Sequence, residues 1–219
     1  MEKIKTEDGS YTFYNNCFGD VYHSRTGAVE EAKEKFARPA IDFLVSQGKS
    51  EAKILDICFG LGYNSCAAID LAEDILGNYK LDITGVEKDM AIIRKICSMS
   101  PGFQSYHLIK RTVQNMPMFL KEENIHIKII VGDALSEITS LKEGFDIVFH
   151  DPFSPKSCPE LWSSYIFGEI AKKIRVGGRL FTYSCARDVR ENLKNAGFAI
   201  VDGPRVGRKA PSTIAIRVV

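Results

Sequence analysis

An acid and an aromatic side chain lie close together at the end of one predicted strand. Residues 145–149 form an apolar run, and the sequence soon continues as Asp151-Pro152-Phe153-Ser154-Pro155. Proline cannot donate to a sheet ladder, so the strand must end before Pro152. Asp151 is thereby placed at the carboxyl end of a buried strand, where open α/β sheets bind ligands. The stiff turn also fixes Phe153 beside it, and this pair suits a planar substrate with a reactive polar group.

A glycine turn and a series of acids indicate a second binding element. Gly60 and Gly62 join a predicted strand at 53–58 to a predicted helix at 64–76. Glycines permit a tight turn and a close backbone approach to a ligand, and the helix N-terminus points at whatever lies over the turn. A lone G-x-G is weak evidence. Three acids on successive strands strengthen it, namely Asp56, Glu87 and Asp133.

The positions of these acids match the needs of a nucleoside. Glu87 ends the second strand, where a carboxylate accepts from ribose hydroxyls, and Asp133 ends the third, beside the expected adenine amine. Each acid alone is equally well explained as a helix N-cap or a turn residue. A dinucleotide fingerprint requires a third glycine, and Ser65 stands in its place. The pattern therefore favours S-adenosylmethionine over a nicotinamide cofactor.

Predicted strands and helices alternate along most of the chain, which indicates a parallel sheet with helices on both faces. The segment 101–124 is expected to be a loop with a helix near Met116–Glu123. Two final strands, at 198–201 and 213–218, have no helix between them and predict an antiparallel hairpin. A mostly parallel seven-stranded sheet that ends in such a hairpin is the pattern of the Rossmann-like class I S-adenosylmethionine-dependent methyltransferases.

The same alternation predicts the domain organisation. Residues 1–50 are expected to form a small N-terminal β/α extension, with a helix at 27–47, that packs on the core. Residues 51–219 are expected to form the methyltransferase core, so that the chain is effectively one domain.

Composition sets further limits. The 219 residues are 45% hydrophobic and 26% charged, as in an ordinary globular protein. No apolar run approaches the roughly 20 residues of a membrane helix, and the N-terminus lacks the apolar core of a signal peptide, so a cytoplasmic protein without membrane contact is expected. The six cysteines form no C-x-x-C pair, so we expect neither a metal site nor a disulfide framework.

The net charge of +1 hides an asymmetry along the chain. From residue 152 onward there are twelve lysines and arginines but five acids, an excess of seven positive charges. A basic C-terminal third suits a polyanion held by its phosphates. A solvated basic face is the competing interpretation.

Taken together, these residues resemble the methyltransferase module of the MnmC family, which methylates 5-aminomethyluridine at the tRNA wobble position. The family's cofactor turn, roughly G-F-G-x-G-x-N, is matched by Phe59, Gly60, Gly62 and Asn64. Its reaction motif, D-G-F-(A/S)-P-x-x-x-P-x-x-W, is matched at six positions between Asp151 and Trp162. Further similar segments are Val86-Glu87-Lys88, Gly207-Arg208-Lys209, Asp8-Gly9-Ser10, Phe18–Ser24 and Gly27–Ala32. The resemblance covers nearly the whole chain.

The resemblance implies a role for each matching residue, with Asp151 as the catalytic residue that binds and orients the amine. The residues expected to bind S-adenosylmethionine are Asp56, Phe59, Gly60, Gly62, Asn64, Glu87, Lys88, Asp133, Ala134 and Asp151. Those expected to bind the substrate are Pro152, Phe153, Ser154, Trp162, Arg208 and Lys209. Phe153 and Trp162 would pack on the uracil ring, with a core position as the alternative for Trp162. Arg208 and Lys209 would hold tRNA phosphates.

The chain departs from the family pattern where Cys58 and Pro152 replace two glycines. Its length leaves no room for the flavin-dependent oxidase of the two-domain members, so a separate enzyme is expected to supply the aminomethyl group. The expected partner is the anticodon region of tRNA, and the product is 5-methylaminomethyluridine, with or without 2-thiolation. Two alternatives stay open: an aminopropyltransferase of the polyamine-synthase kind, although the G-G-G-D-G turn of that family is absent, and a non-catalytic protein that binds S-adenosylmethionine or tRNA.

Overall fold

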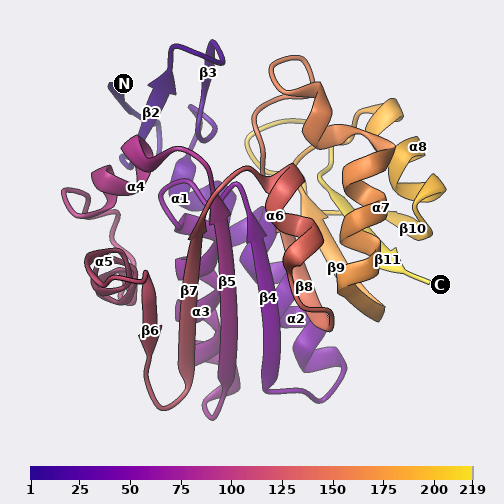
Figure 1. The fold of residues 1–219 in the computed structure, drawn as a ribbon, viewed down its shortest axis with the longest axis horizontal. Coiled ribbons are helices and arrows are strands. Elements are labelled where there is room, and N and C mark those ends of the chain that lie inside the picture. The colour runs from indigo at the N-terminus through magenta and orange to yellow at the C-terminus, as the bar shows by residue number, and fades with distance from the viewer. Residues whose placement is uncertain (219) are drawn as a thin grey trace.

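The structure is a computed structural model and describes residues 1–218. An eight-stranded sheet forms its centre, in the order β10-β11-β9-β8-β4-β5-β7-β6 (Figure 1). The strands are β4 (Glu51–Ile57), β5 (Lys80–Glu87), β6 (Phe119–Lys121), β7 (Ile125–Val131), β8 (Phe145–His150), β9 (Ile174–Thr182), β10 (Phe198–Asp202) and β11 (Thr213–Arg217). Strands β7, β5, β4, β8 and β9 pair in parallel, whereas β11 is antiparallel to β9 and to β10. The predicted mostly parallel sheet with a terminal antiparallel hairpin is confirmed.

One predicted element is wrong. The helix expected near Met116–Glu123 is instead the short strand β6, which pairs antiparallel with β7 at the sheet edge and adds an eighth strand to the seven predicted. Leu120 is buried, whereas Phe119 and Lys121 on either side are exposed, and this period of two fits a half-buried edge strand. The helix of this region comes earlier, as α5 (Tyr106–Gln114).

Helices cover both faces of the sheet (Figure 1). The helices that pack on one face are α1 (Ala28–Glu31), α2 (Arg38–Ser46), α3 (Tyr63–Leu76), α4 (Met90–Ile96) and α5, and those on the other are α6 (Ala134–Ser140), α7 (Ser164–Lys173) and α8 (Arg187–Asn195). Successive residues of a strand supply the two cores, since Ile147 and Phe149 of β8 belong to the first and Val148 to the second. No helix within residues 1–218 has both the length and the apolar character needed to cross a lipid bilayer.

The helix predicted at 27–47 is one continuous helical run with a wider turn inside it. The π-helical segment η1 (Ala32–Ala37) joins α1 to α2. Pro39 follows in the first turn of α2. Because proline has no N–H, it cannot donate to the carbonyl of Lys35 four residues before it, and the regular ladder is interrupted there. Such π-helical turns are often found at functional sites.

A small antiparallel sheet of β1 (Glu2–Lys5), β2 (Tyr11–Asn15) and β3 (Asp20–Val21) precedes these helices. Asp8, between β1 and β2, ties this sheet to α1, because its Oδ2 accepts from the N–H groups of Val29 and Glu30 at 3.1 and 3.0 Å. Burial by itself would raise the pKa of the Asp8 carboxyl. Hydrogen bonds from Ser10, from Thr6 and from the Glu30 N–H outweigh burial and lower this pKa to about 2. The N-terminal sheet and α1 are therefore fixed to each other as a unit.

Candidate functional site

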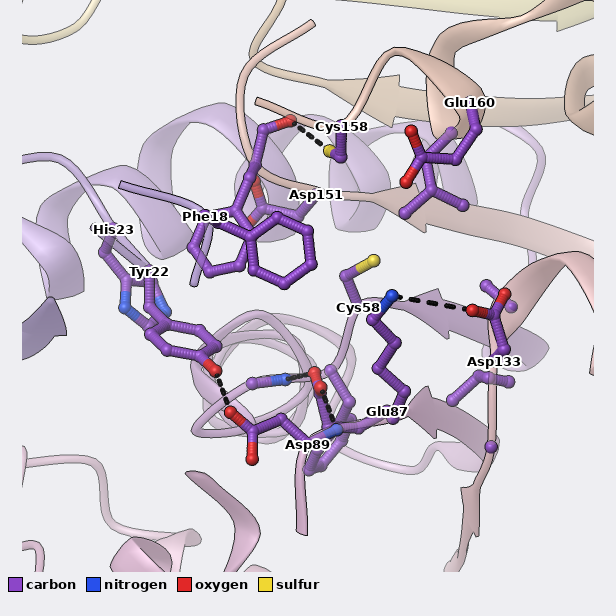
Figure 2. Close-up of a pocket in the computed structure, with 18 residues that line it drawn as sticks. Phe18, Tyr22, His23, Cys58, Glu87, Asp89, Asp133, Asp151, Cys158 and Glu160 are labelled. Carbon is purple, nitrogen blue, oxygen red and sulfur yellow. Dashed lines mark hydrogen bonds and ion pairs between the residues drawn. The ribbon is translucent and has the colours of Figure 1, made fainter. Parts of the chain in front are cut away.

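Two adjoining cavities lie at the carboxyl ends of the central strands. The first cavity is lined by Phe18, Tyr22, His23, Cys58–Gly60, Val86–Asp89, Gly132–Ala134, Asp151, Phe153, Cys158, Glu160 and Leu161 (Figure 2). The second cavity is lined by Asp20–Ser24, Glu31, Lys35, Asp151–Ser154, Tyr183, Gly207 and Arg208. Tyr22, His23, Asp151 and Phe153 belong to both. Asp151 is the one carboxylate among these four shared residues.

Glu87 holds the glycine turn against the end of β5. Its Oε2 accepts from the Gly60 N–H at 2.9 Å and its Oε1 accepts from the Asp89 N–H at 2.8 Å. Burial raises the pKa of Glu87, although these backbone hydrogen bonds oppose the shift. Each carboxylate oxygen has a further lone pair. Glu87 therefore keeps acceptor capacity for a ribose hydroxyl, and the predicted contact stays a prediction.

The phenyl ring of Phe59 explains two of the glycines. A Cβ at Gly62 would lie 2.7 Å from Phe59 Cζ, and a Cβ at Gly85 in β5 would lie 2.5 Å from Phe59 Cδ2. The ring therefore packs against both backbones, and any larger residue would displace it. Gly62 lines neither cavity, so the structure gives it this packing role, while the predicted contact with a cofactor stays untested. Phe59 and Gly60 do line the first cavity.

Cys58 has a left-handed backbone conformation, with φ of +64°. This is the position where the family pattern has glycine, and a left-handed conformation is the reason a glycine suits it. The thiol points into the first cavity (Figure 2). Burial, together with the nearby charge of Glu87, raises the pKa of the Cys58 thiol well above its usual value.

Asp133 serves the fold and the cavity at once. Its Oδ1 accepts from the Leu135 N–H at 2.9 Å and caps α6, as the competing N-cap interpretation anticipated. Its Oδ2 lies 3.5 Å from Lys88 Nζ, on the wall of the first cavity. Ala134 lines the same wall. The predicted set Glu87, Lys88, Asp133 and Ala134 is thus brought together along one side of this cavity.

Asp56 and Asn64 line neither cavity. Asp56 is fully buried on β4, where its Oδ2 accepts from Ser65 Oγ at 2.6 Å and its Oδ1 has no hydrogen-bond partner within residues 1–218. Burial raises the pKa of Asp56 to about 7. Asn64, at the start of α3, donates from Nδ2 to Asp151 Oδ2 at 2.9 Å. Asn64 contacts Asp151, which lines both cavities, and Asp56 contacts Ser65 in the first turn of α3. Their predicted contacts with the cofactor remain predictions.

Asp151 lies at the boundary of the two cavities. Its backbone N–H donates to the Ile57 carbonyl at 3.2 Å, which continues the pairing of β8 with β4 past the end of the strand. Burial raises the pKa of Asp151 well above the ordinary carboxyl value, and the charge of Glu31 adds to the shift, while the hydrogen bond from Asn64 opposes it. A carboxylate with a raised pKa is a better proton acceptor near neutral pH than an ordinary one.

The loop after Asp151 is held from both sides. The Phe153 ring stacks on Phe18, with ring centroids 4.8 Å apart, and forms a T-shaped contact with the Tyr22 ring, with centroids 4.9 Å apart. Trp162 Nε1 donates to the Phe153 carbonyl at 2.8 Å, and only 3% of Trp162 is exposed. Trp162 lines neither cavity, so the core position weighed against uracil packing is the one it occupies. Phe153, by contrast, is on the walls of both.

Of the remaining predicted substrate residues, three line the second cavity and one does not. Pro152, Ser154 and Arg208 line the second cavity, and the Arg208 guanidinium donates to the Tyr183 carbonyl. Lys209 is exposed and lines neither cavity. No group of three or more His, Cys, Asp or Glu side chains that could hold a metal occurs in the described part of the chain.

The N-terminal segment supplies site residues that the predicted set lacks. Tyr22 donates from its hydroxyl to Asp89 Oδ2 at 2.7 Å, as Figure 2 shows. Burial and this acceptor raise the pKa of Tyr22 far above its usual range. Glu31 and Lys35, from α1 and η1, line the second cavity. The signals for them in the sequence are a pair of opposite charges four residues apart and, for Glu31, its place in the family-like segment Gly27–Ala32.

The chain is similar to known proteins over nearly its whole length. Residues 102–217 match the profile of a family described as S-adenosyl-L-methionine-dependent methyltransferase. The crystal structure of MNMC2 from Aquifex aeolicus is 30% identical, with a TM-score of 0.83, over 98% of this chain and 70% of that one. An uncharacterized protein of Methanocaldococcus jannaschii is 31% identical over 98% of this chain. The tRNA 5-methylaminomethyl-2-thiouridine biosynthesis bifunctional protein MnmC of Ralstonia nicotianae is 29% identical over 93% of this chain. The chain spans 59% and 33% of the lengths of these two relatives.

Proposed function

The chain belongs to the MnmC-type family of S-adenosyl-L-methionine-dependent methyltransferases, and from this premise we propose that it methylates the nitrogen of a 5-aminomethyl group on the wobble uridine of tRNA. The observation that carries the proposal is the position of Asp151. Its carboxylate lies on the walls of both cavities. A residue there can contact a substrate in one cavity and the reacting end of a cofactor in the other.

We assign the first cavity to the cofactor. Its residues fit an adenosyl group, because Glu87 keeps lone pairs for ribose hydroxyls and Asp133 presents a carboxylate beside Ala134 for the adenine amine. When bound, S-adenosylmethionine supplies a methyl group on a positively charged sulfur. Asp151 and the glycine turn would lie at the methionine end of this cofactor.

We assign the second cavity to the amine. An alkylamine resembles a lysine, whose pKa is about 10, so it enters as an ammonium and must lose a proton before its lone pair can react. Asp151 binds the ammonium, and its raised pKa suits it to accept that proton. The nitrogen lone pair then forms the N–C bond as the C–S bond breaks, and the electron pair of that bond stays on sulfur. The protein's task is alignment, with nitrogen and carbon about 3–3.5 Å apart.

The base and the tRNA would contact the rim of the second cavity. Phe153 offers a ring face beside Asp151, and base stacking on an aromatic ring contributes about 1–3 kcal/mol. Arg208 supplies a positive charge at the rim, and Lys209 adds an exposed one for tRNA phosphates. Residues 1–50 act in this proposal as an extension of the core at 51–219, because Phe18 and Tyr22 complete the cofactor cavity.

The test is transfer of labelled methyl groups to tRNA that carries 5-aminomethyluridine. Asp151→Asn keeps the shape of the side chain but removes its negative charge, and we expect turnover to fall at least about a hundredfold, as for loss of a positioned acid or base. Asp188→Asn changes an exposed acid on α8 and is the matched control. Wild-type turnover by Asp151→Asn would remove Asp151 from the mechanism. The same assay with decarboxylated S-adenosylmethionine tests the aminopropyl alternative.

A further inference from the structure

A buried ion pair forms part of the wall of the second cavity. Glu31 Oε1 lies 2.6 Å from Lys35 Nζ, and their side chains are only 12% and 5% exposed. The other oxygen of Glu31 accepts from the Ser24 N–H at 2.9 Å. Glu31 is the one acceptor that residues 1–218 offer to the Lys35 ammonium, which has three donors. Two Lys35 donors are therefore available to a molecule in the cavity.

This pair spans the junction between α1 and the wider turn of the helix. Glu31 ends α1 and Lys35 belongs to the π-helical segment η1, just before Pro39. An exposed pair of the same kind, Glu34 and Arg38, lies on the same helical run at 3.8 Å, with both side chains 43% exposed. One pair of opposite charges thus faces the solvent, while the other faces the cavity.

The charges around the cavity leave one negative charge in excess. The lining acids are Asp20, Glu31 and Asp151, and the lining bases are Lys35 and Arg208. Asp20 Oδ2 already accepts from the Ser154 N–H at 3.2 Å and from Ser157 Oγ at 3.1 Å. Among the described residues, Glu31 accepts only one hydrogen bond at each oxygen, and Asp151 accepts a side-chain bond only from Asn64, so both carboxylates keep lone pairs for a ligand. A buried charge requires a partner, and a single ammonium group completes this set.

We propose that Glu31 and Lys35 together recognise two neighbouring polar groups of the substituted pyrimidine, Glu31 accepting from the amine of the 5-aminomethyl group and Lys35 donating to the carbonyl oxygen on C4. This inference rests on the proposed function and extends it. The acceptor and the donor lie side by side on the protein, and on the base the aminomethyl group and the carbonyl oxygen are carried by the adjacent ring atoms C5 and C4. Glu31 would hold the amine from one side and Asp151 from the other, and a uridine without the aminomethyl group would leave Glu31 without its ligand.

The two roles open to this pair are distinguished by reversing it. Glu31→Lys combined with Lys35→Glu keeps an ion pair for the helix but presents the wrong charge to each group of the base. Glu34→Arg combined with Arg38→Glu reverses the exposed pair and is the matched control. Glu31→Gln alone is a milder variant, in case the reversed pair does not fold. Thermal melting of each variant shows whether the fold is kept.

The measurement is the preference in tRNA affinity for 5-aminomethyluridine over unmodified uridine, with S-adenosylhomocysteine present so that no chemistry occurs. We expect the reversed pair to lose at least about tenfold of the wild-type preference, and Glu31→Gln to lose a similar amount, since a charged hydrogen bond is removed. The control pair should keep it. A folded Glu31→Gln variant with the full preference would overturn the inference. Absence of methyl transfer by the wild type would instead refute the proposed function.

Discussion

The amide of Asn64 donates to Asp151 Oδ2 at 2.9 Å and thereby links the first turn of α3 to the loop after β8. Asn64 is 5% exposed, so little water can replace it. A buried carboxylate that loses a hydrogen bond becomes both less fixed and harder to ionise. The orientation of the central acid therefore depends on a residue that lines neither cavity.

Replacing Asn64 by Ala should lower the turnover number by about tenfold to a hundredfold, because hydrogen bonds to charged groups contribute roughly 1.5–3 kcal/mol. The Asn64 bond lowers the pKa of Asp151. Without it that pKa rises, and the loss of activity at low pH should begin at a higher pH than in the wild type. Steady-state rates across pH measure both effects. Asn195→Ala, on the exposed end of α8, is the control, and an unchanged pH profile in Asn64→Ala would contradict the argument.

The buried acid Asp56 should make the fold less stable at high pH. Burial raises the pKa of Asp56 from 3.8 to about 7, so the folded state holds the proton more tightly than the unfolded state. The resulting stabilisation is complete below about pH 4 and is lost as the pH rises through about 7. A shift of this size corresponds to about 4 kcal/mol at most.

The pH effect is measured as the difference in unfolding free energy between Asp56→Asn and the wild type, because the other titrating groups cancel. We expect the unfolding free energy of Asp56→Asn to rise relative to that of the wild type between pH 4 and pH 7. Near pH 8 the difference should become constant. Urea unfolding at these pH values provides the data. Asp82→Asn, on an exposed position of β5, should show no such trend. A difference for Asp56→Asn that does not change with pH would mean that Asp56 is ionised in the fold.

Two cysteines should respond to very different extents to the same substitution, Cys→Gly. Cys58 has φ of +64°, whereas Cys66 is fully buried in α3. Cys58→Gly relieves a left-handed conformation that costs a side chain roughly 1–2 kcal/mol, which offsets the lost thiol contacts, so stability should change by less than about 1 kcal/mol. Cys66→Gly removes a buried side chain and places glycine inside a helix, at a cost of about 2 kcal/mol or more. Chemical denaturation compares them, and equal losses would show that the Cys58 backbone is not strained.

The acids at the strand ends could be predicted because parallel strands end at the same edge of a sheet. Glu87, Asp133 and Asp151 each lie at the carboxyl end of a different strand, and all three line one cavity. The spacing of strands and turns carries that information along the chain. The same spacing could not distinguish a strand from a helix at 116–123, because a short apolar segment fits either period.

The site residues from the N-terminal segment could not be predicted from the spacing of strands and turns. Tyr22, Glu31 and Lys35 reach the cavities through the packing of a separate small sheet and a π-helical turn. Nothing local in the sequence specifies that packing. Trp162 is the opposite case, a residue that the sequence singled out but that lines neither cavity. The motif match gives its position in the chain but not the orientation of its side chain. Its indole turns inward to the Phe153 carbonyl, where a buried N–H finds an acceptor.

The ring of Phe59 restricts which residues can occupy position 85 as the sequence evolves. Gly85 lies inside β5, where a glycine weakens a strand, and the Phe59 ring packed against it leaves no room for a side chain. The two positions should therefore change together as relatives diverge. Where a lineage exchanges the phenylalanine for a small residue, selection for glycine at position 85 disappears, and a β-branched residue can take its place.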